Sequence, residues 1–166
     1  IIAAGVCKYA GARRVVITDV NDYRLELARK MGADAAVNTL SEDLREVMHK
    51  QRLVEGFDIG LEMSGSGAAL TQMVSVMRNG GKISLLGISN KPVPMDMNKI
   101  ICKGLTLQGI YGRKMDNWHQ MSYMVQGGLD LTPVITHRFH YTQFEEGFAA
   151  MNSGKSGKVI LDWTKK

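Results

Sequence analysis

The stretch VVITDVNDYRLELARKMGAD, residues 15–34, decides the fold. Its first part is a β-branched run that ends at Asp19, which is typical of a short buried strand. Asn21 then stands where a helix N-cap is expected, and Gly32 stands where the helix should stop. We therefore predict a strand followed by an amphipathic helix. The predicted apolar face of that helix consists of Tyr23, Leu27, Ala28 and Met31.

The rest of the chain repeats this alternation. An opening helix should end at Gly11, and further strands are expected at 35–38, 57–65, 82–88 and 105–112. Further helices are expected at 41–51, with Ser41 as N-cap, and at 67–81, 96–103 and 114–128; a β, α, β tail follows at 131–140, 141–154 and 155–163. Repeated βαβ units predict an α/β fold of the Rossmann type, a doubly wound parallel sheet with helices on both faces.

Composition narrows the function classes. The 166 residues are 45% hydrophobic and 22% charged, as in ordinary globular domains, and the net charge is +5. Basic residues are scattered and do not form a stripe with aromatic residues, which argues against nucleic-acid binding. Cys7 and Cys102 lie far apart, without metal spacing, so a reduced, cytoplasmic setting is expected. Every apolar run is too short to span a bilayer, which argues against a membrane role.

Asp19 has a specific expected role if the fold binds a dinucleotide. In such folds an acid after the second strand accepts hydrogen bonds from the adenosine ribose, about 20 residues past a glycine-rich phosphate loop. Counting back from Asp19 places the last glycine of that loop just before residue 1, so we expect the first strand and the loop to lie upstream. The alternative is a loop acid without a ligand. A carboxylate here repels the 2′-phosphate of NADP, so NAD is the expected cofactor.

Other candidate cofactor contacts lie at later points of the pattern. Arg24 could hydrogen-bond the ribose or stack on adenine, or it could simply pair with Asp22 or Glu26 on the helix surface. Ligands of open α/β sheets bind outside the carboxyl ends of strands. This rule selects Leu86, Gly87 and Ile88 after the central strand, and Ile110 and Tyr111 after the next one, with Ser64–Gly65 as a weaker candidate. Gly87 could equally end a strand, and Tyr111 could be a half-buried core aromatic.

Catalytic groups are harder to find. The four histidines show no paired metal spacing, and neither a Ser-His-Asp set nor a carboxylate pair stands out. We therefore predict no catalytic residue and no metal ligand within this chain.

Several motifs together resemble those of the zinc-dependent medium-chain dehydrogenases. GGKISLLGI at 80–88 and ITHRF at 135–139 are common across that family, and the similarity covers nearly the whole chain. Two further stretches, ITDVNDYRLELARKMG at 17–32 and GIYGRKM at 109–115, resemble the members that oxidise L-threonine to 2-amino-3-oxobutanoate. The resemblance places NAD contacts on Asp19, Arg24, Leu86, Gly87, Ile88, Ile110 and Tyr111.

The same resemblance implies how the chain is organised. A cofactor domain would occupy residues 1–128, and residues 129–166 would return to the catalytic domain. The zinc ligands and the glycine loop would lie upstream, so the chain alone should be inactive. Such enzymes are usually homo-tetramers that pair edge to edge through the last strand of the cofactor domain. Three alternatives stay open: a sorbitol- or butanediol-type dehydrogenase, a nucleotide-binding module without catalysis, and a methyltransferase.

Overall fold

Every strand pair formed within residues 1–164 is parallel, which confirms the predicted α/β class. A computed structural model describes residues 1–164; Lys165 and Lys166, the end of the predicted C-terminal segment, lie outside them. The chain divides into two compact units, Ile1–Val47 with Met115–Lys166, and Met48–Lys114. No helix formed by residues 1–164 has both the length and the apolar character needed to cross a membrane.

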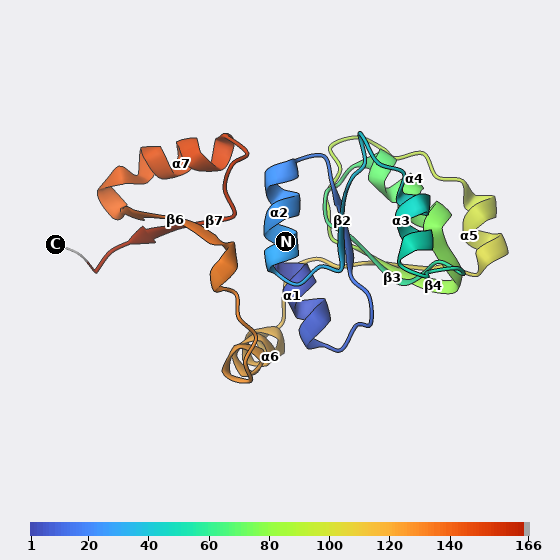
Figure 1. The fold of residues 1–166 in the computed structure, drawn as a ribbon, viewed down its shortest axis with the longest axis horizontal. Coiled ribbons are helices and arrows are strands. Elements are labelled where there is room, and N and C mark those ends of the chain that lie inside the picture. The colour runs from blue at the N-terminus through green and yellow to red at the C-terminus, as the bar shows by residue number, and fades with distance from the viewer. Residues whose placement is uncertain (165–166) are drawn as a thin grey trace. The chain divides into compact units, whose positions relative to one another are not determined.

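The first unit alternates helices and strands from its first residues (Figure 1). Its early elements are α1 (Ile2–Tyr9), β1 (Val16–Asp19), α2 (Asp22–Lys30), β2 (Ala35–Asn38) and the start of α3 (Leu44–Lys50). Its later elements are α6 (Met115–Gln126), a 3-10 turn (Thr132–Val134), β6 (Ile135–His140), a 3-10 turn (Tyr141–Gln143), α7 (Phe144–Asn152) and β7 (Lys158–Asp162).

Helix α2 packs on β2 through most of the predicted face, since Leu27, Ala28 and Met31 are buried. Asn21 caps the helix as expected, since its side chain accepts a hydrogen bond from the Arg24 amide. Leu25 is only 1% exposed and packs with Ala28 against the strand, whereas Tyr23 is exposed. The prediction for Tyr23 was therefore wrong. The helix begins at Asp22, so positions three apart from Ala28 face the strand and Tyr23 turns away.

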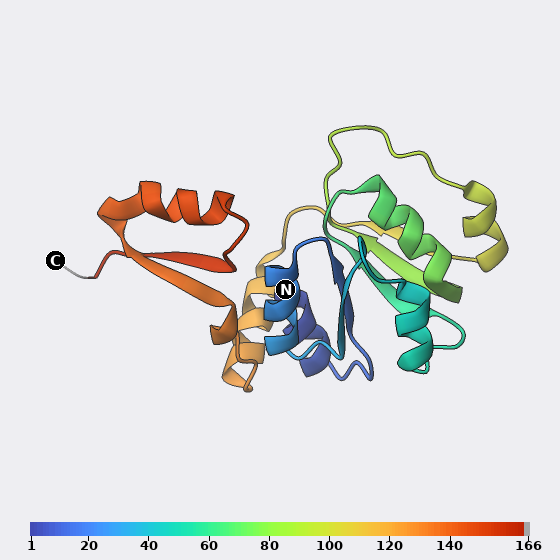
Figure 2. The same cartoon turned by 45° about the horizontal axis from the view of Figure 1, so that its top comes forward.

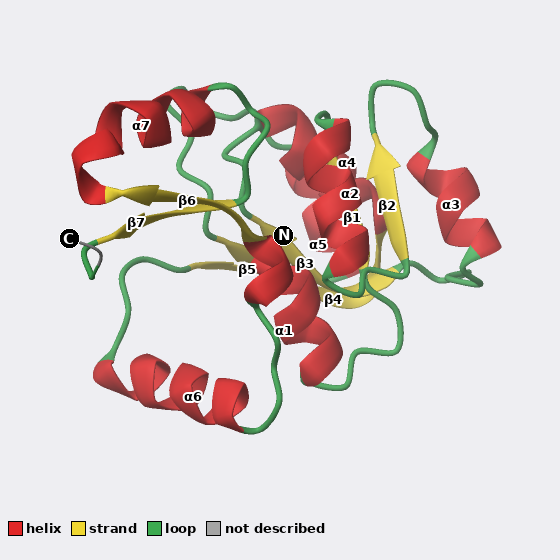
Figure 3. Cartoon of the chain, turned by 60° about the vertical axis from the view of Figure 1, so that its left-hand side comes forward, coloured by secondary structure: helices red, strands yellow, loops and turns green. Residues whose placement is uncertain are grey.

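The predicted β, α, β tail is confirmed and packs within the first unit. Strands β6 and β7 pair in parallel, and α7 lies along them (Figure 3). Val134, just before β6, shares a buried cluster with Ala4 of α1, Val15 and Met31. The C-terminal segment is therefore part of the same core as the first two helices.

Helix α3 is shorter than predicted at its beginning. Asp43, not Ser41, supplies the side-chain oxygen that accepts from the amide of Arg45 in the first turn. The Ser41 hydroxyl instead donates to the carbonyl oxygen of Asn38. An aspartate caps as well as a serine does, so the sequence alone could not separate the two positions.

The second unit is a three-stranded parallel ladder in the order β3, β4, β5, with α4 and α5 packed against it (Figure 2). Its elements are β3 (Phe57–Glu62), α4 (Gly67–Val76), β4 (Met77–Leu85), α5 (Met97–Lys103) and β5 (Thr106–Gly109). The core between helices and strands is built on Val74, Met77 and Ile83.

Helix α4 ends five residues before its predicted end at 81. Met77 is already extended and pairs with Phe57, and residues 78–81 form an irregularity in the ladder before Lys82 pairs with Ile59. The ammonium group of Lys103 donates to the carbonyl oxygens of Val74, Ser75 and Met77 and so satisfies the end of the helix. This contact comes from a residue 26 or more positions away and could not be read from the local pattern.

Candidate cofactor-binding site

The predicted cofactor residues fall into two groups, one in each unit. Asp19 ends β1, and Arg24 lies in the first turn of α2, in the first unit. The other group lies in the second unit just past the carboxyl ends of β4 and β5, and consists of Leu86, Gly87, Ile88, Ile110 and Tyr111. The structure thus brings the members of each group close together.

The Asp19 carboxylate is half used by the chain itself. Its Oδ1 accepts hydrogen bonds from the amides of Val20, at 2.7 Å, and of Asn21, at 3.0 Å. These two bonds stabilise the turn from β1 into α2, so Asp19 does have the structural role that was the alternative to ligand binding. Oδ2 accepts no hydrogen bond from any residue of the described range 1–164. One oxygen is therefore held in a fixed direction, and the other can accept from a ligand.

Arg24 does not make the surface ion pairs that were its alternative role. Glu26 pairs with Arg29, at 3.4 Å, and Asp22 accepts a hydrogen bond from the Asn38 side chain, at 2.7 Å. Within residues 1–164 the Arg24 guanidinium has no hydrogen bond or ion pair. An exposed cation without an acid partner, five residues from Asp19, is available to a polar ligand.

The first residue of the chain lies beside this pair. Ile1, at the amino end of α1, lies within electrostatic reach of both the Asp19 carboxylate and the Arg24 guanidinium. The amino end of α1, the carboxyl end of β1 and the start of α2 therefore share one neighbourhood. In dinucleotide-binding folds this is the region that meets the adenosine half of the cofactor.

The turn after β4 leaves no room for a side chain at position 87. The amides of Leu86 and Gly87 both donate to the carbonyl oxygen of Glu62, at 2.8 and 2.9 Å. A methyl group on Gly87 would lie 2.1 Å from the amide nitrogen of Gly65. Gly87 is thus required by close contact between two turns. Ile88, next in sequence, is 79% exposed.

The turn after β5 carries two exposed apolar side chains. The Ile110 amide donates to the carbonyl oxygen of Leu85 at 2.9 Å and so fixes this turn to the end of β4. Tyr111 is 93% exposed, which excludes a core role for its ring in this unit. With Leu86 and Ile88, these side chains give the carboxyl ends of β4 and β5 an apolar rim. An apolar rim with backbone groups fixed behind it is suited to a flat ring.

Glu62 is a residue of this region that the sequence pattern did not predict. It ends β3, only 4% exposed, with its carboxylate bonded to the Ser64–Gly65 turn that was a weaker candidate. An acid inside the apolar run FDIGLEMSG was the signal that could have found it, because a charge is seldom placed in a buried strand without a bonded role.

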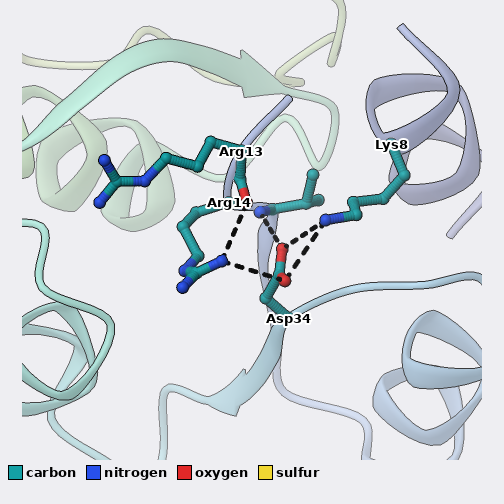
Figure 4. Close-up of polar contacts among 5 residues, drawn as sticks. Lys8, Arg13, Arg14 and Asp34 are labelled. Carbon is teal, nitrogen blue, oxygen red and sulfur yellow. Dashed lines mark hydrogen bonds and ion pairs between the residues drawn. The ribbon is translucent and has the colours of Figure 1, made fainter. Parts of the chain in front are cut away.

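A cluster of ion pairs and hydrogen bonds around Asp34 holds the opposite, amino end of β1 and β2 (Figure 4). Asp34 accepts from the amide of Val15 at 2.7 Å and from the Lys8 ammonium at 3.2 and 3.3 Å, and Arg14 lies 3.9 Å away. Partial desolvation acts to raise the pKa of Asp34, but the Val15 hydrogen bond and the charges of Lys8 and Arg14 together lower it. This cluster ties α1 to the start of the ladder.

The described residues offer neither a metal-binding cluster nor an activated cysteine. Across residues 1–164, no three His, Cys, Asp or Glu side chains come together in a way that could hold a metal ion. Cys7 and Cys102 are free thiols, and burial raises the pKa of Cys7, which makes its reactive thiolate less available. The described residues therefore do not fit a zinc site.

Relatives identify the fold and the family. The curated L-threonine 3-dehydrogenases of Aeromonas salmonicida and Burkholderia vietnamiensis are each 58% identical to this chain over 99% of its length. The chain spans about half of these relatives, 48% of each. The similarity therefore concerns about half of each relative's sequence.

Solved structures show the same fold at lower sequence identity. An Escherichia coli alcohol dehydrogenase solved with NADH matches 96% of this chain and 48% of its own, with a TM-score of 0.84 and 20% identity. The 2R,3R-butanediol dehydrogenase of Bacillus subtilis matches 94% of this chain and 45% of its own, with a TM-score of 0.83 and 23% identity. These matches confirm the predicted Rossmann-type arrangement of the cofactor domain in such dehydrogenases.

The match at family level covers most of the sequence. Residues 1–127 fit the family model described as zinc-binding dehydrogenase. This range contains every predicted cofactor residue, from Asp19 to Tyr111. The chain belongs to the zinc-binding dehydrogenase family.

Proposed function

We propose that this chain is the NAD-binding part of an enzyme that oxidises L-threonine. The C3 hydroxyl of threonine loses its proton and C3 loses a hydride, giving 2-amino-3-oxobutanoate, while NAD becomes NADH. The observation that carries the proposal is what lies at the carboxyl ends of the strands. In the first unit this is Asp19, which has one carboxylate oxygen without a hydrogen bond from residues 1–164; in the second unit it is the apolar turns that Gly87 allows to pack closely. Identity of 58% to named L-threonine 3-dehydrogenases supports the choice of substrate.

Different residues of the chain are proposed to bind the two halves of NAD. We assign the adenosine ribose hydroxyls to Asp19 and a polar or stacking contact to Arg24. The turns at Leu86–Ile88 and Ile110–Tyr111 are assigned to the other half of the cofactor, where fixed backbone and apolar side chains exclude water. When bound, NAD supplies the hydride acceptor. The negative charge of Asp19 disfavours NADP, because its 2′-phosphate would lie against a like charge.

Other parts of the proposal concern the rest of the protein. We propose that residues 1–128 form the cofactor domain, that 129–166 lead into the catalytic domain, and that the zinc ligands lie outside this chain, which alone is inactive. We also propose a cytoplasmic homo-tetramer. Within residues 1–164, β5 pairs only with β4 and leaves its other edge open, which supports pairing with the β5 of a second copy.

The direct test is to follow NADH formation by the full-length protein with NAD and L-threonine, sorbitol or 2,3-butanediol. Formation with L-threonine alone is the expected result. Turnover of sorbitol or butanediol in its place would make the protein a polyol dehydrogenase. Binding of NAD without turnover of any alcohol would support a nucleotide-binding module, and failure to bind NAD in calorimetry would contradict the proposal entirely.

A further inference from the structure

Glu62 is the charged side chain that is buried in the described part of the chain, and the assignments above give it no role. It lies at the end of β3, beside the turn that follows β4. Burying a carboxylate costs several kcal/mol unless hydrogen bonds compensate for the lost water. The contacts of this residue show where that compensation comes from.

Its carboxylate closes the turn after β3. Oε1 accepts from the amide of Ser64 at 2.9 Å, from the Ser64 hydroxyl, and from the amide of Gly65 at 3.2 Å. Oε2 also accepts from Gly65, at 3.1 Å. Bonds from donors to a charged acceptor are stronger than those between neutral groups, so this turn is held firmly.

The main chain of the same residue holds the neighbouring turn. The Glu62 carbonyl oxygen accepts from both Leu86 and Gly87. The two turns then touch directly: a methyl group on Gly87 would lie 2.5 Å from Oε2 of Glu62, and one on Gly65, where φ is +71°, would lie 2.4 Å from the Ile88 carbonyl oxygen. One residue thus sets the position of both turns, and neither turn has space to move toward the other.

We propose that Glu62 is a positioning residue for the cofactor, which fixes the Leu86–Ile88 turn in the place where NAD meets it. This inference rests on the proposed function. Glu62 itself is buried and does not touch the cofactor. Its effect passes through Gly65 and Gly87. Loss of its charge would let the two turns separate, and the backbone that faces NAD would no longer be held before binding.

The test is Glu62→Gln in the full-length protein. The glutamine has the same shape, but its amide nitrogen would oppose the Gly65 amide, donor against donor. We expect the Kd for NAD, measured by calorimetry, to rise about tenfold, with kcat at saturating NAD within about twofold of wild type. The matched control is Lys103→Met, which removes bonds to three carbonyl groups in the same unit and leaves both turns intact. It should lower the melting temperature without changing the Kd.

The outcomes are separable. An unchanged Kd in Glu62→Gln, or a rise that Lys103→Met reproduces at equal loss of melting temperature, would overturn the positioning role. If the wild-type protein does not bind NAD, the proposed function fails first and this inference fails with it. Should Glu62→Gln not fold, Ser64→Ala decides: it removes one donor to the carboxylate, and an unchanged Kd in place of the expected rise of about threefold would overturn the inference.

Discussion

The two ends of the β1–β2 ladder each carry an aspartate, and the two are used differently. At the amino end, the oxygens of Asp34 are taken by the Val15 amide and the Lys8 ammonium group. At the carboxyl end, one oxygen of Asp19 accepts hydrogen bonds from the amides of Val20 and Asn21, and the other accepts none from residues 1–164. A carboxylate whose oxygens all accept hydrogen bonds from its own chain has a structural role, whereas one with an oxygen left over can accept a hydrogen bond from a ligand.

The largest expected effect lies at the carboxyl ends of the second ladder. Gly87→Ala would place a methyl group against the Gly65 amide, so one of the two turns must shift. We expect kcat/KM for NAD to fall about 100-fold, because displacements of about 1 Å have such effects. Steady-state kinetics of the full-length protein checks this. Gly109→Ala is the control, since nothing lies within 4 Å of its added methyl group; equal losses in both variants would contradict the account.

Asp34→Asn tests the structural end of the comparison. The amide can still accept from Val15, but it loses the attraction to Lys8 and Arg14. We expect a loss of about 1 kcal/mol in the free energy of unfolding, a modest value because the cluster is partly exposed and solvent screens it. Urea unfolding measures the loss. The Kd for NAD should stay at the wild-type value, and a change in it would show that the two ends are not separate.

The lowered pKa of Asp34 predicts how the stability of the protein depends on pH. Its pKa is lower in the folded state than in the unfolded chain, so its contribution is complete above the unfolded value, near pH 4, and is lost as the pH falls through the folded value. Wild-type stability should therefore decrease more steeply below about pH 4 than that of Asp34→Asn. Parallel curves for the two proteins would remove Asp34 from the acid response.

Asn21 joins the cofactor end to the C-terminal segment. Its side chain caps α2 through Arg24 and also donates to the Gly154 carbonyl oxygen at 3.0 Å. Asn21→Ala should cost about 1 kcal/mol of stability through the lost cap. Asn21→Ser restores the cap but not the bond to Gly154, so hydrogen exchange at 153–157 should stay faster than in the wild type. Wild-type exchange in the serine variant would show that the bond to Gly154 has no effect.

The smallest effect is expected at Arg24. Its guanidinium has no partner within residues 1–164, so Arg24→Met should leave the melting temperature unchanged. The Kd for NAD should rise about threefold, as for one exposed polar contact. Arg29→Met is the matched control on the same helix: it loses its pair with Glu26 and its bond to the Ala36 carbonyl oxygen, and should affect stability alone. An unaltered Kd in Arg24→Met would show that Arg24 does not contact NAD, and Asp19 would then be the one proposed contact at the carboxyl end of β1.

Local signals in the sequence were sufficient for much of the fold. The Asn21 cap, the positive φ of Gly11 and Gly32, and the strand at 35–38 all follow from residue chemistry within a few positions, and the structure confirms them. The end of α4 did not follow, because it depends on Lys103 and on the pairing of Met77 with Phe57. Contacts distant in sequence determine such boundaries.

The site divides in the same way. Positions after strands, such as Gly87 and Ile110, could be selected because ligands bind at carboxyl ends in parallel sheets. For Glu62 the sequence shows only an acid inside an apolar strand, whereas its role lies in hydrogen bonds to two turns, one of them 24 or more residues away. The contacts proposed for NAD on Asp19, Arg24 and the strand ends stay predictions until binding is measured.

The most direct test compares Asp19→Ala with Asp34→Asn in the full-length protein, by the ratio of kcat/KM for NAD to that for NADP. If the free oxygen of Asp19 accepts from the ribose, Asp19→Ala lowers this ratio at least about tenfold, since a bond to a charged group and a like-charge repulsion are both removed. Asp34→Asn leaves the ratio at its wild-type value. An unchanged ratio in Asp19→Ala would contradict the account, because it would show that this carboxylate does not read the ribose.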